Sequence, residues 1–172
     1  MALLPIITAP DPRLRQVSQP VDKVDDMVRR LMDDMLETMY AAPGVGLSAI
    51  QVGIAKRIVV IDAAKDPDPP SPLRLVNPEI VWRSEAIVPH EEGCLSFPEQ
   101  YEEVERSSEV RVRYVDENGE IRQLEADGLL AIAVQHELDH LDGVLLVDHV
   151  SKMKRNIIMR RMKKARRLQA AE

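Results

Sequence analysis

Apolar residues recur at helical spacing along two stretches of the chain, and each stretch predicts a helix. From residue 25 to about residue 40, apolar side chains such as Met27 and Leu31 return every three or four positions, which predicts an amphipathic helix. A second stretch begins after Asp127, a residue type that favours the N-cap position, and ends near Gly143. Its first half is apolar nearly all round, so this second helix is expected to be buried.

Between these helices the pattern changes to short strands. Residues 57–62 are a β-branched run, and strands are expected at 73–76 and 79–88, with Asn77 and Pro78 interrupting them. Residues 65–72, rich in Pro and Asp, predict a surface loop. Residues 109–115 and 120–124 alternate with period two, and the turn residues 116–119 predict a hairpin between them. This order of elements predicts an α+β fold, with small, mostly antiparallel sheets around the buried helix.

The end of the chain predicts a third helix with an unusual charge. Ser151 is a suitable N-cap, and an apolar stripe against the body would be formed by Met153, Ile157, Met162 and Ala165. Residues 1–151 contain 14 Lys and Arg against 28 Asp and Glu, whereas residues 152–172 contain nine Lys and Arg against one Glu. This split favours a polyanionic partner for the tail, or else a solvated helix face that only offsets the acidic body.

The composition is typical of one globular domain. The chain has 172 residues, of which 45% are hydrophobic and 30% are charged, so it is long enough for a single core. Aromatic residues are only 3%, so the core must consist mainly of aliphatic residues and Met. A single Cys excludes an internal disulfide framework and is typical of a reducing cytosol. We expect a cytoplasmic protein that is not bound to a membrane, with a catalytic body at 1–150 and a basic helix at 151–172 in the same domain.

The buried helix contains His136, Glu137 and His140 in an HExxH pattern. Two His residues four positions apart project from one helix face, so both can bind the same metal ion. Glu137 lies between them and is close enough to act as general base on a water. A catalytic site usually needs a third protein ligand, and Cys94, the only cysteine, is the natural candidate. The pattern therefore predicts hydrolytic metal chemistry.

The pattern alone leaves other interpretations open. HExxH also occurs by chance on exposed helices that bind nothing. A closed structural zinc site would need a fourth ligand, either His90 or His149. A zincin-type endopeptidase would take its third ligand downstream of the helix, from Asp142, Asp148 or His149. A non-catalytic nucleic-acid-binding module would use the basic tail and keep its metal for structure.

Three motifs, in order, resemble the signature blocks of the bacterial peptide deformylases. They are Gly-Val-Gly-Leu-Ser-Ala-Ile-Gln at residues 44–51, Glu-Gly-Cys-Leu-Ser at 92–96 and Gln-His-Glu-Leu-Asp-His at 135–140. The resemblance extends over essentially the whole chain and includes the basic terminal helix. It implies a metal-dependent hydrolase that removes the formyl group from the N-terminal formyl-methionine of nascent polypeptides and releases formate.

The resemblance also implies a role for each residue of the site. The ligands of one divalent metal ion would be Cys94, His136 and His140, with Fe2+ favoured by the family and Zn2+, Ni2+ or Co2+ also compatible with the ligands. Glu137 would be the general base, and the oxyanion would accept hydrogen bonds from the Gln51 side chain and the Leu95 backbone N–H. The methionine pocket would be lined by Val45, Gly46, Leu129, Ile132 and Ala133. The implied partners are formyl-methionyl nascent peptides and, through the basic helix, the ribosome, with the enzyme acting as a monomer.

Overall fold

The protein is described from a computed structural model that covers residues 2–65 and 68–171. Its helices are α1 (Asp26–Ala41), α2 (Gly128–Leu141) and α3 (Lys152–Ala170), with short 3-10 turns η1 (Pro12–Arg15), η2 (Ala49–Val52) and η3 (Leu146–His149). Its strands are β1 (Gly46–Ser48), β2 (Ile58–Ile61), β3 (Leu73–Arg83), β4 (Ile87–Cys94), β5 (Phe97–Ser107), β6 (Glu109–Val115) and β7 (Ile121–Asp127). The predicted α+β class is confirmed.

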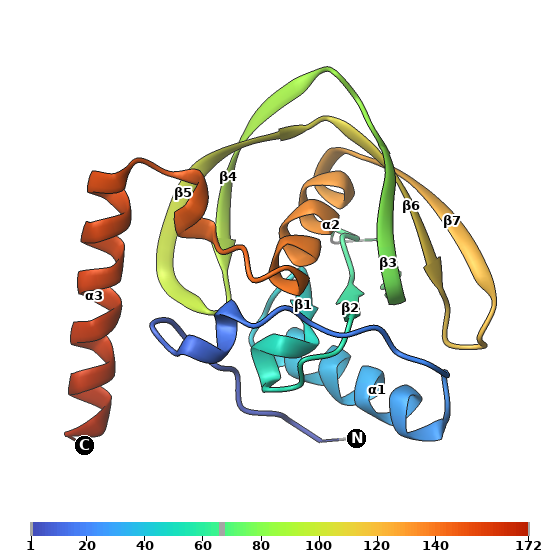
Figure 1. The fold of residues 1–172 in the computed structure, drawn as a ribbon, viewed down its shortest axis with the longest axis horizontal. Coiled ribbons are helices and arrows are strands. Elements are labelled where there is room, and N and C mark those ends of the chain that lie inside the picture. Colours follow the sequence, from blue (N-terminus) through green and yellow to red (C-terminus); the bar gives the residue numbers. More distant parts are fainter. Residues whose placement is uncertain (1, 66–67, 172) are drawn as a thin grey trace.

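The strands form one sheet and one separate ribbon, both antiparallel. The sheet has five strands in the order β1-β2-β3-β6-β7, and β4 pairs with β5 alone. Figure 1 shows α2 in the middle of the molecule, between the ribbon on one side and the sheet on the other. Helix α3 lies outside the ribbon, at the edge of the molecule.

Strand β2 shows how the sheet is buried between two helices. Successive side chains of a strand point to opposite faces, and all four residues of β2 are buried. Ile58 and Val60 belong to the cluster that contains α1, whereas Val59 and Ile61 belong to the cluster that contains α2. The two helices therefore cover opposite faces of the sheet, and the prediction that α2 is a buried helix is confirmed.

Helices α1 and α2 agree with the sequence prediction except in two details. Asp25 caps α1, because its side chain accepts a hydrogen bond from the Val28 backbone N–H at 3.0 Å. Met27, expected in the apolar stripe of α1, is 74% exposed and faces solvent instead. Asp127 occupies the N-cap position of α2, but its side chain makes no capping hydrogen bond. Gly143, with φ of 75°, follows the end of α2 as predicted.

The expected break at Asn77 and Pro78 is wrong, because β3 runs through both residues. Asn77 adopts a left-handed backbone with φ of 51°, and the pairing of β3 with β6 shifts register there. Asn tolerates this conformation better than most residues. Its side chain also donates to the Val21 carbonyl and accepts from the Val21 N–H, both at 2.8 Å. The bulge is thus held by contacts from a distant segment.

The β4–β5 ribbon differs most from the prediction. The strand expected at 79–88 is divided between the end of β3 and the start of β4, and the sequence pattern gave no indication of β5. β5 contains four Glu residues, a residue type depleted in strands, so its local propensity is low. Its pairing with β4 and its contacts with the helices stabilise it instead.

The remaining predicted elements can be placed on the described residues. The hairpin is confirmed, with Gly119 at φ of 79° in the turn and strands that pair from Glu109 opposite Asp127 to Val115 opposite Ile121. The expected loop at 65–72 includes residues 66 and 67, which lie outside the described residues, and residues 68–72 contain neither helix nor strand.

Helix α3 begins where the sequence predicts, but a different face packs on the body. The Ser151 side chain accepts from the Lys154 N–H at 3.2 Å and caps the helix. The buried residues are Ile158 and Met162, which join a cluster with Phe97 and Val104 of β5. The predicted apolar stripe is therefore wrong in part. Of its four residues, Met162 is buried, but Met153, Ile157 and Ala165 are exposed. Within residues 2–65 and 68–171, no helix has the combined length and apolar character that crossing a membrane requires.

We predict that Ile158→Ala destabilises the protein by about 2–4 kcal/mol, because it leaves a cavity between α3 and β5. Ile157→Ala on the neighbouring position is the matched control, since Ile157 is 39% exposed while Ile158 is 2% exposed. The control should cost less than about 1 kcal/mol. Urea denaturation of both variants measures the difference, and equal losses would show that α3 does not pack as described.

Candidate metal centre

Three side chains from two elements converge on one point. Cys94 lies at the end of β4, and His136 and His140 lie four residues apart on α2. One ligand atom from each residue lies within 4.8 Å of the others. The Cys94 Sγ and His140 Nε2 atoms are 3.4 Å apart, close to the roughly 3.6 Å expected when ordinary metal–sulfur and metal–nitrogen bonds meet at a tetrahedral ion. One thiolate and two imidazoles are a donor set that suits borderline transition metals.

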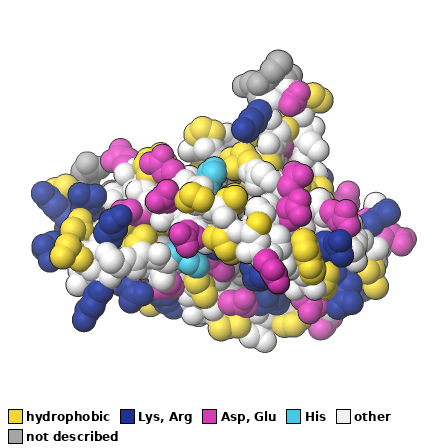
Figure 2. Space-filling view, turned by 90° about the horizontal axis from the view of Figure 1, so that it is seen from above, with side chains coloured by type: hydrophobic (Ala, Val, Ile, Leu, Met, Phe, Trp, Pro, Cys, Tyr) yellow, Lys and Arg dark blue, Asp and Glu magenta, His cyan; other side chains and the backbone are white. Residues whose placement is uncertain are grey.

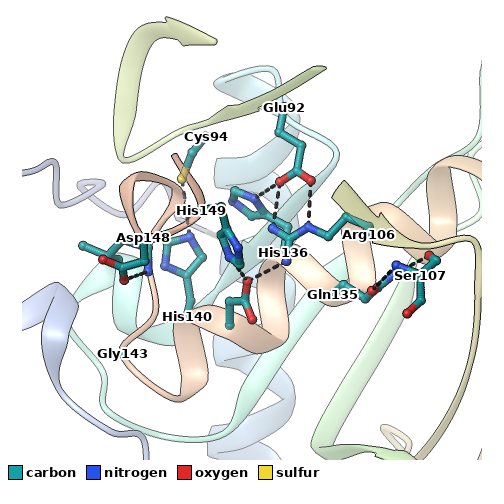
Figure 3. Close-up of polar contacts among 12 residues, drawn as sticks. Glu92, Cys94, Arg106, Ser107, Gln135, His136, His140, Gly143, Asp148 and His149 are labelled. Atoms are coloured by element: carbon teal, nitrogen blue, oxygen red, sulfur yellow. Dashed lines mark hydrogen bonds and ion pairs between the residues drawn. The ribbon is translucent and has the colours of Figure 1, made fainter. Parts of the chain in front are cut away.

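Glu92 fixes the orientation of His136. The Nδ1 atom of His136 lies 2.9 Å from Glu92 Oε1, so its other ring nitrogen, Nε2, is free to face a metal ion. Carboxylate contacts of this kind hold the ring and select its tautomer. Figure 3 shows Glu92 above His136, and Cys94 pointing toward His140.

Glu92 is in turn held by a buried arginine. Arg106 of β5 donates from Nε and Nη2 to the two oxygens of Glu92, at 2.8 and 2.9 Å (Figure 3). Both side chains are nearly inaccessible, at 5% and 4% exposed. Arg106 also donates to Asp139 of α2 at 2.7 Å, and Asp139 contacts His149 at 2.8 Å. This network joins the ribbon to the helix that carries the histidines.

The environment shifts the pKa values of the acidic side chains in opposite directions. Burial acts to raise the pKa of Glu92, but the hydrogen bonds from Arg106 and His136 outweigh it and lower the pKa to about 2. Burial raises the pKa of Glu137 to about 7 in the metal-free protein. Glu92 is therefore ionised, and Glu137 is poised to exchange a proton near neutral pH.

The surroundings of the two histidines shift their pKa values in opposite directions. Burial lowers the pKa of His140 well below its ordinary value, so its imidazole is neutral and can bind a metal ion. Burial also acts to lower the pKa of His136, but the Cys94 sulfur and then Glu137 raise it well above its ordinary value. Positive charge is thus favoured beside Cys94. Glu137 Oε1 is buried and has no hydrogen-bond partner among the described residues, as expected for a group that faces a ligand.

Gln51 is held in place by two buried serines. Its Oε1 atom accepts from the Ser48 N–H and the Ser48 hydroxyl, both at 3.0 Å. Its Nε2 atom donates to the Ser96 hydroxyl at 2.9 Å and lies 3.7 Å from Cys94 Sγ. The Ser96 hydroxyl donates onward to the Ile7 carbonyl at 2.7 Å. The Gln51 amide is therefore a rigid hydrogen-bond donor beside the Cys94 ligand.

Close packing requires glycine at two positions of the glycine-rich segment, residues 44–51. A Cβ atom on Gly46 would lie 2.7 Å from Glu137 Oε2, and one on Gly44 would lie 2.7 Å from Leu95 Cδ1. Neither position has room for a larger residue without displacing a side chain of the site. The glycines let this segment approach both Glu137 and Leu95.

A cavity of about 680 Å³ opens from these residues. Its lining includes all five residues predicted for the methionine pocket, namely Val45, Gly46, Leu129, Ile132 and Ala133. It also includes five of the residues predicted for catalysis and metal binding, namely Gln51, Cys94, Leu95, His136 and Glu137. The structure therefore brings the predicted site residues together around one space.

The other candidate ligands lie elsewhere. Asp142 pairs with Arg57 at 3.1 Å, and Asp148 pairs with Arg15 at 2.5 Å. His149 contacts Asp139, as noted above, and His90 lines the outer cavity without joining the ligand group. Within the described parts of the chain, the group that could hold a metal ion is thus the one with the upstream Cys. This arrangement does not fit a zincin with a downstream third ligand or a closed zinc site with a fourth histidine.

Sequence reasoning missed the partners of the ligands. Glu92 lies in the second motif without an assigned role, and Arg106 was not singled out at all. The only signal was indirect: a buried helix with several polar residues requires hydrogen-bond partners. Nothing in the pattern identified which of the many Arg and Glu residues would supply them.

The comparisons with known proteins agree with this geometry. The family model described as Polypeptide deformylase matches residues 3–156. A peptide deformylase from Phenylobacterium zucineum is 54% identical over 164 residues, which cover 95% of this chain and 97% of that protein.

Solved structures of peptide deformylases have the same fold as this chain. The crystal structure of peptide deformylase from Ehrlichia chaffeensis superposes with a TM-score of 0.94 at 39% identity, covering 98% of this chain and 99% of that one. A Met-Ala-Ser-bound peptide deformylase from Acinetobacter baumannii superposes with a TM-score of 0.82 at 34% identity, covering 87% and 99%.

We predict that Glu92→Gln weakens metal binding by about 10- to 100-fold. If the amide oxygen accepts from His136 and Arg106 Nη2, the amide NH2 group faces the Arg106 Nε donor, and the negative charge that pairs with the guanidinium is lost. Zinc affinity measured by competition with a chelator tests this directly. Glu105→Gln is the matched control, since Glu105 lies on the same ribbon but is exposed. Equal affinities in both variants would contradict the orienting role of Glu92.

Proposed function

The chain belongs to the polypeptide deformylase family, and we propose that it carries out the family reaction with Cys94, His136 and His140 as metal ligands. The protein is a hydrolase that removes the formyl group from the N-terminal formyl-methionine of peptides. One observation supports the assignment most: the three proposed ligand residues lie together, and two of them, Cys94 and His136, line the same cavity as Glu137. A divalent ion held there supplies a Lewis acid that makes a water molecule more acidic.

Glu137 is proposed as the general base and then the general acid. Its buried, unpartnered Oε1 atom is available to accept a proton from the attacking water. The water oxygen bonds to the formyl carbon, the C–N bond breaks, and the proton held by Glu137 passes to the departing amine. The products are formate and a peptide with a free N-terminal methionine.

Gln51 and Leu95 are proposed as donors to the oxyanion that forms at the formyl oxygen. The hydrogen bonds that Gln51 accepts from Ser48 and donates to Ser96 support this role, because they fix its amide before the substrate binds. Leu95 follows the Cys94 ligand directly, so its backbone N–H lies at the same edge of the site. Loss of one such donor typically raises the barrier by about 3–4 kcal/mol.

The methionine side chain is proposed to occupy the inner cavity. Ile132 and Ala133 of α2 form a buried apolar wall there, and Val45 and Gly46 lie on the opposite segment. Leu129 completes this set at the start of α2. An unbranched, polarisable side chain such as methionine fits an irregular apolar space of this kind.

The metal in the cell is proposed to be Fe2+, on the basis of the family resemblance. The thiolate and two imidazoles are also compatible with Zn2+, Ni2+ or Co2+. For that reason, activity should be measured on protein loaded with iron under anaerobic conditions.

We predict that Glu137→Gln retains about one metal ion per chain but lowers the turnover of formyl-Met-Ala-Ser by about 10²–10⁴-fold or more. The reason is that Glu137 is not needed to complete the ligand set, whereas both proposed proton transfers depend on it. Metal content is measured by mass spectrometry alongside the assay, with Glu105→Gln as the control. Near wild-type turnover in the metal-replete variant would refute the role of Glu137, and no turnover by wild-type protein would refute the proposed reaction.

The basic helix is proposed to bind the ribosome. We propose that residues 1–150 form the catalytic body of the domain. Residues 151–172 of the same domain would contact rRNA phosphate near the site where nascent peptides emerge. All nine Lys and Arg side chains on α3 are exposed, which supports this proposal, and only Ile158 and Met162 of the helix are buried. We propose further that the protein is a monomer and works in the cytoplasm.

We predict that reversing three exposed charges, by Lys163→Glu, Lys164→Glu and Arg167→Glu together, abolishes co-sedimentation with ribosomes. This variant is preferable to a truncation beyond Arg160, which would also remove the buried Met162. Wild-type binding should weaken steeply as salt is raised. The control is Lys23→Glu, Arg30→Glu and Lys56→Glu, which makes the same charge change on exposed positions of the body.

Two outcomes would contradict ribosome binding through α3. The first is equal co-sedimentation of the two triple variants. The second is a wild-type protein that does not co-sediment at low salt. Hydrolysis of a formylated tripeptide by both variants serves as the check that they are folded.

A further inference from the structure

Asp62, a buried residue outside the site described above, makes hydrogen bonds to four separate positions of the chain. It follows β2 directly and is 8% exposed. Its Oδ2 atom accepts from the Tyr40 hydroxyl and, at 3.1 Å, from the Ser71 N–H. Its Oδ1 atom accepts from the Ala64 N–H at 3.0 Å, and its own backbone N–H donates to the Val45 carbonyl at 2.8 Å. Both the side chain and the backbone of Asp62 therefore hold other segments.

The Tyr40 hydroxyl is the one side-chain donor among these contacts. Partial burial and then the hydrogen bond to Asp62 raise the pKa of Tyr40 to about 12, so the hydroxyl stays protonated at neutral pH. Tyr40 is the residue before the last residue of α1. The bond therefore joins the end of α1 to the end of β2.

The two bonds from Tyr40 and to Val45 enclose the segment between α1 and β1. Tyr40 and Val45 both bond Asp62, and residues 41–44 connect them along the chain. The chain and the two bonds thus form a closed ring of contacts. Inside the ring, the Gly44 N–H donates to the Met39 carbonyl at 2.7 Å and closes a turn. One residue, Asp62, therefore holds both ends of this turn.

The enclosed segment has little packing to hold it in place. None of residues 41–46 is buried, and Val45 is 38% exposed. Figure 2 shows apolar surface of this kind, with hydrophobic side chains exposed next to histidine in the middle of one face. A segment with few buried apolar contacts is mobile unless hydrogen bonds fix it. From Gly46 onward the pairing of β1 with β2 does so, and before it the bonds to Asp62 do.

The same segment forms one wall of the cavity. Residues 42–46 all line the cavity, whereas Tyr40 and Asp62 do not. Val45 and Gly46 are two of the residues proposed above to surround the methionine side chain. A shift of this segment would therefore change the shape of the space that receives the methionine.

We infer that Tyr40 and Asp62 are positioning residues for methionine selectivity, because their hydrogen bond holds residues 42–46 where the cavity fits the substrate side chain. The inference rests on the proposed function, since the side chain concerned is that of the formylated residue. Without the Tyr40 hydroxyl the ring of contacts is open, and the wall is free to move. A mobile wall contacts a long side chain less well, and it matters little to a side chain too short to reach it.

The test compares kcat/KM for formyl-Met-Ala-Ser and formyl-Ala-Ala-Ser in wild-type protein and in Tyr40→Phe, both loaded with the same metal. The ratio of the two values measures selectivity for methionine, and any loss of folded or metal-loaded protein cancels in it. Because Tyr40→Phe removes only the hydroxyl, we expect the ratio to fall by about 3- to 10-fold. Most of the fall should be a higher KM for formyl-Met-Ala-Ser, since the metal ligands and Glu137 lie on other elements.

Tyr114→Phe is the matched control. It removes the same hydroxyl from a tyrosine of β6 that does not line the cavity. We expect this variant to keep the wild-type ratio, even if its stability changes. A fall confined to Tyr40→Phe then assigns the effect to the contact with Asp62.

Asp62→Asn tests the other side of the same bond. Either orientation of the new amide turns its NH2 group toward a backbone N–H, that of Ala64 or that of Ser71, so Asp62→Asn should also lower the ratio. Residues in contact usually show coupled effects. The double variant of Tyr40→Phe and Asp62→Asn should therefore lower the ratio by less than the product of the two single effects.

The outcomes separate this inference from the proposed function. If wild-type protein hydrolyses neither peptide, the proposed function itself fails. If formyl-Met-Ala-Ser is hydrolysed but Tyr40→Phe keeps the wild-type ratio, only the positioning role is overturned. A wild-type ratio near one, equal falls in Tyr40→Phe and Tyr114→Phe, or single effects that simply multiply in the double variant also overturn it.

Discussion

The buried ion pair between Glu92 and Arg106 is the interaction on which the site depends. Removing two charges from water costs several kcal/mol per ion, so such a pair is stable only with good geometry and further hydrogen bonds. Both conditions are met, because the pair is bidentate and Arg106 also bonds Asp139. These contacts connect β4, β5 and α2, and Glu92 extends them to His136. The ribbon that carries Cys94 is thereby fixed against the helix that carries both histidines.

The close packing around Glu137 follows from the same arrangement. With the ribbon and α2 fixed, the glycine-rich segment closes the remaining side of the site, and Gly46 leaves only enough room for the Glu137 carboxylate. Gln51, at the end of this segment, is held by Ser48 and Ser96. Gln51 and Glu137, the proposed donor and the proposed base, are therefore positioned before a substrate arrives, as electrostatic stabilisation of a transition state requires.

The sequence predicts features that depend on local periodicity and fails where distant contacts decide. The spacing of His136 and His140 needs only a helix, and the hairpin before α2 needs only alternation and a turn, so both were predictable. The β5 strand was not, because its Glu-rich sequence disfavours a strand and its stability comes from β4 and α3. The burial of Ile158 rather than Ile157 depends on the direction from which the body meets α3. Likewise, a charge such as Arg106 is buried only because tertiary contacts supply its partners.

Strand β5 connects the two charged regions of the molecule, since it borders the cavity and also packs against α3. Tyr101 lines the cavity, while the buried Val104 of the same strand packs with Ile158 and Met162. Arg161 of α3 donates to Gln100, which is itself part of the cavity wall, at 3.3 Å. The same strand thus borders the cavity and contacts the basic helix. A polyanion bound by α3, as proposed, would be repelled by Glu91 and Glu99, two exposed carboxylates that border the cavity, so the entrance of the cavity would stay open to a peptide.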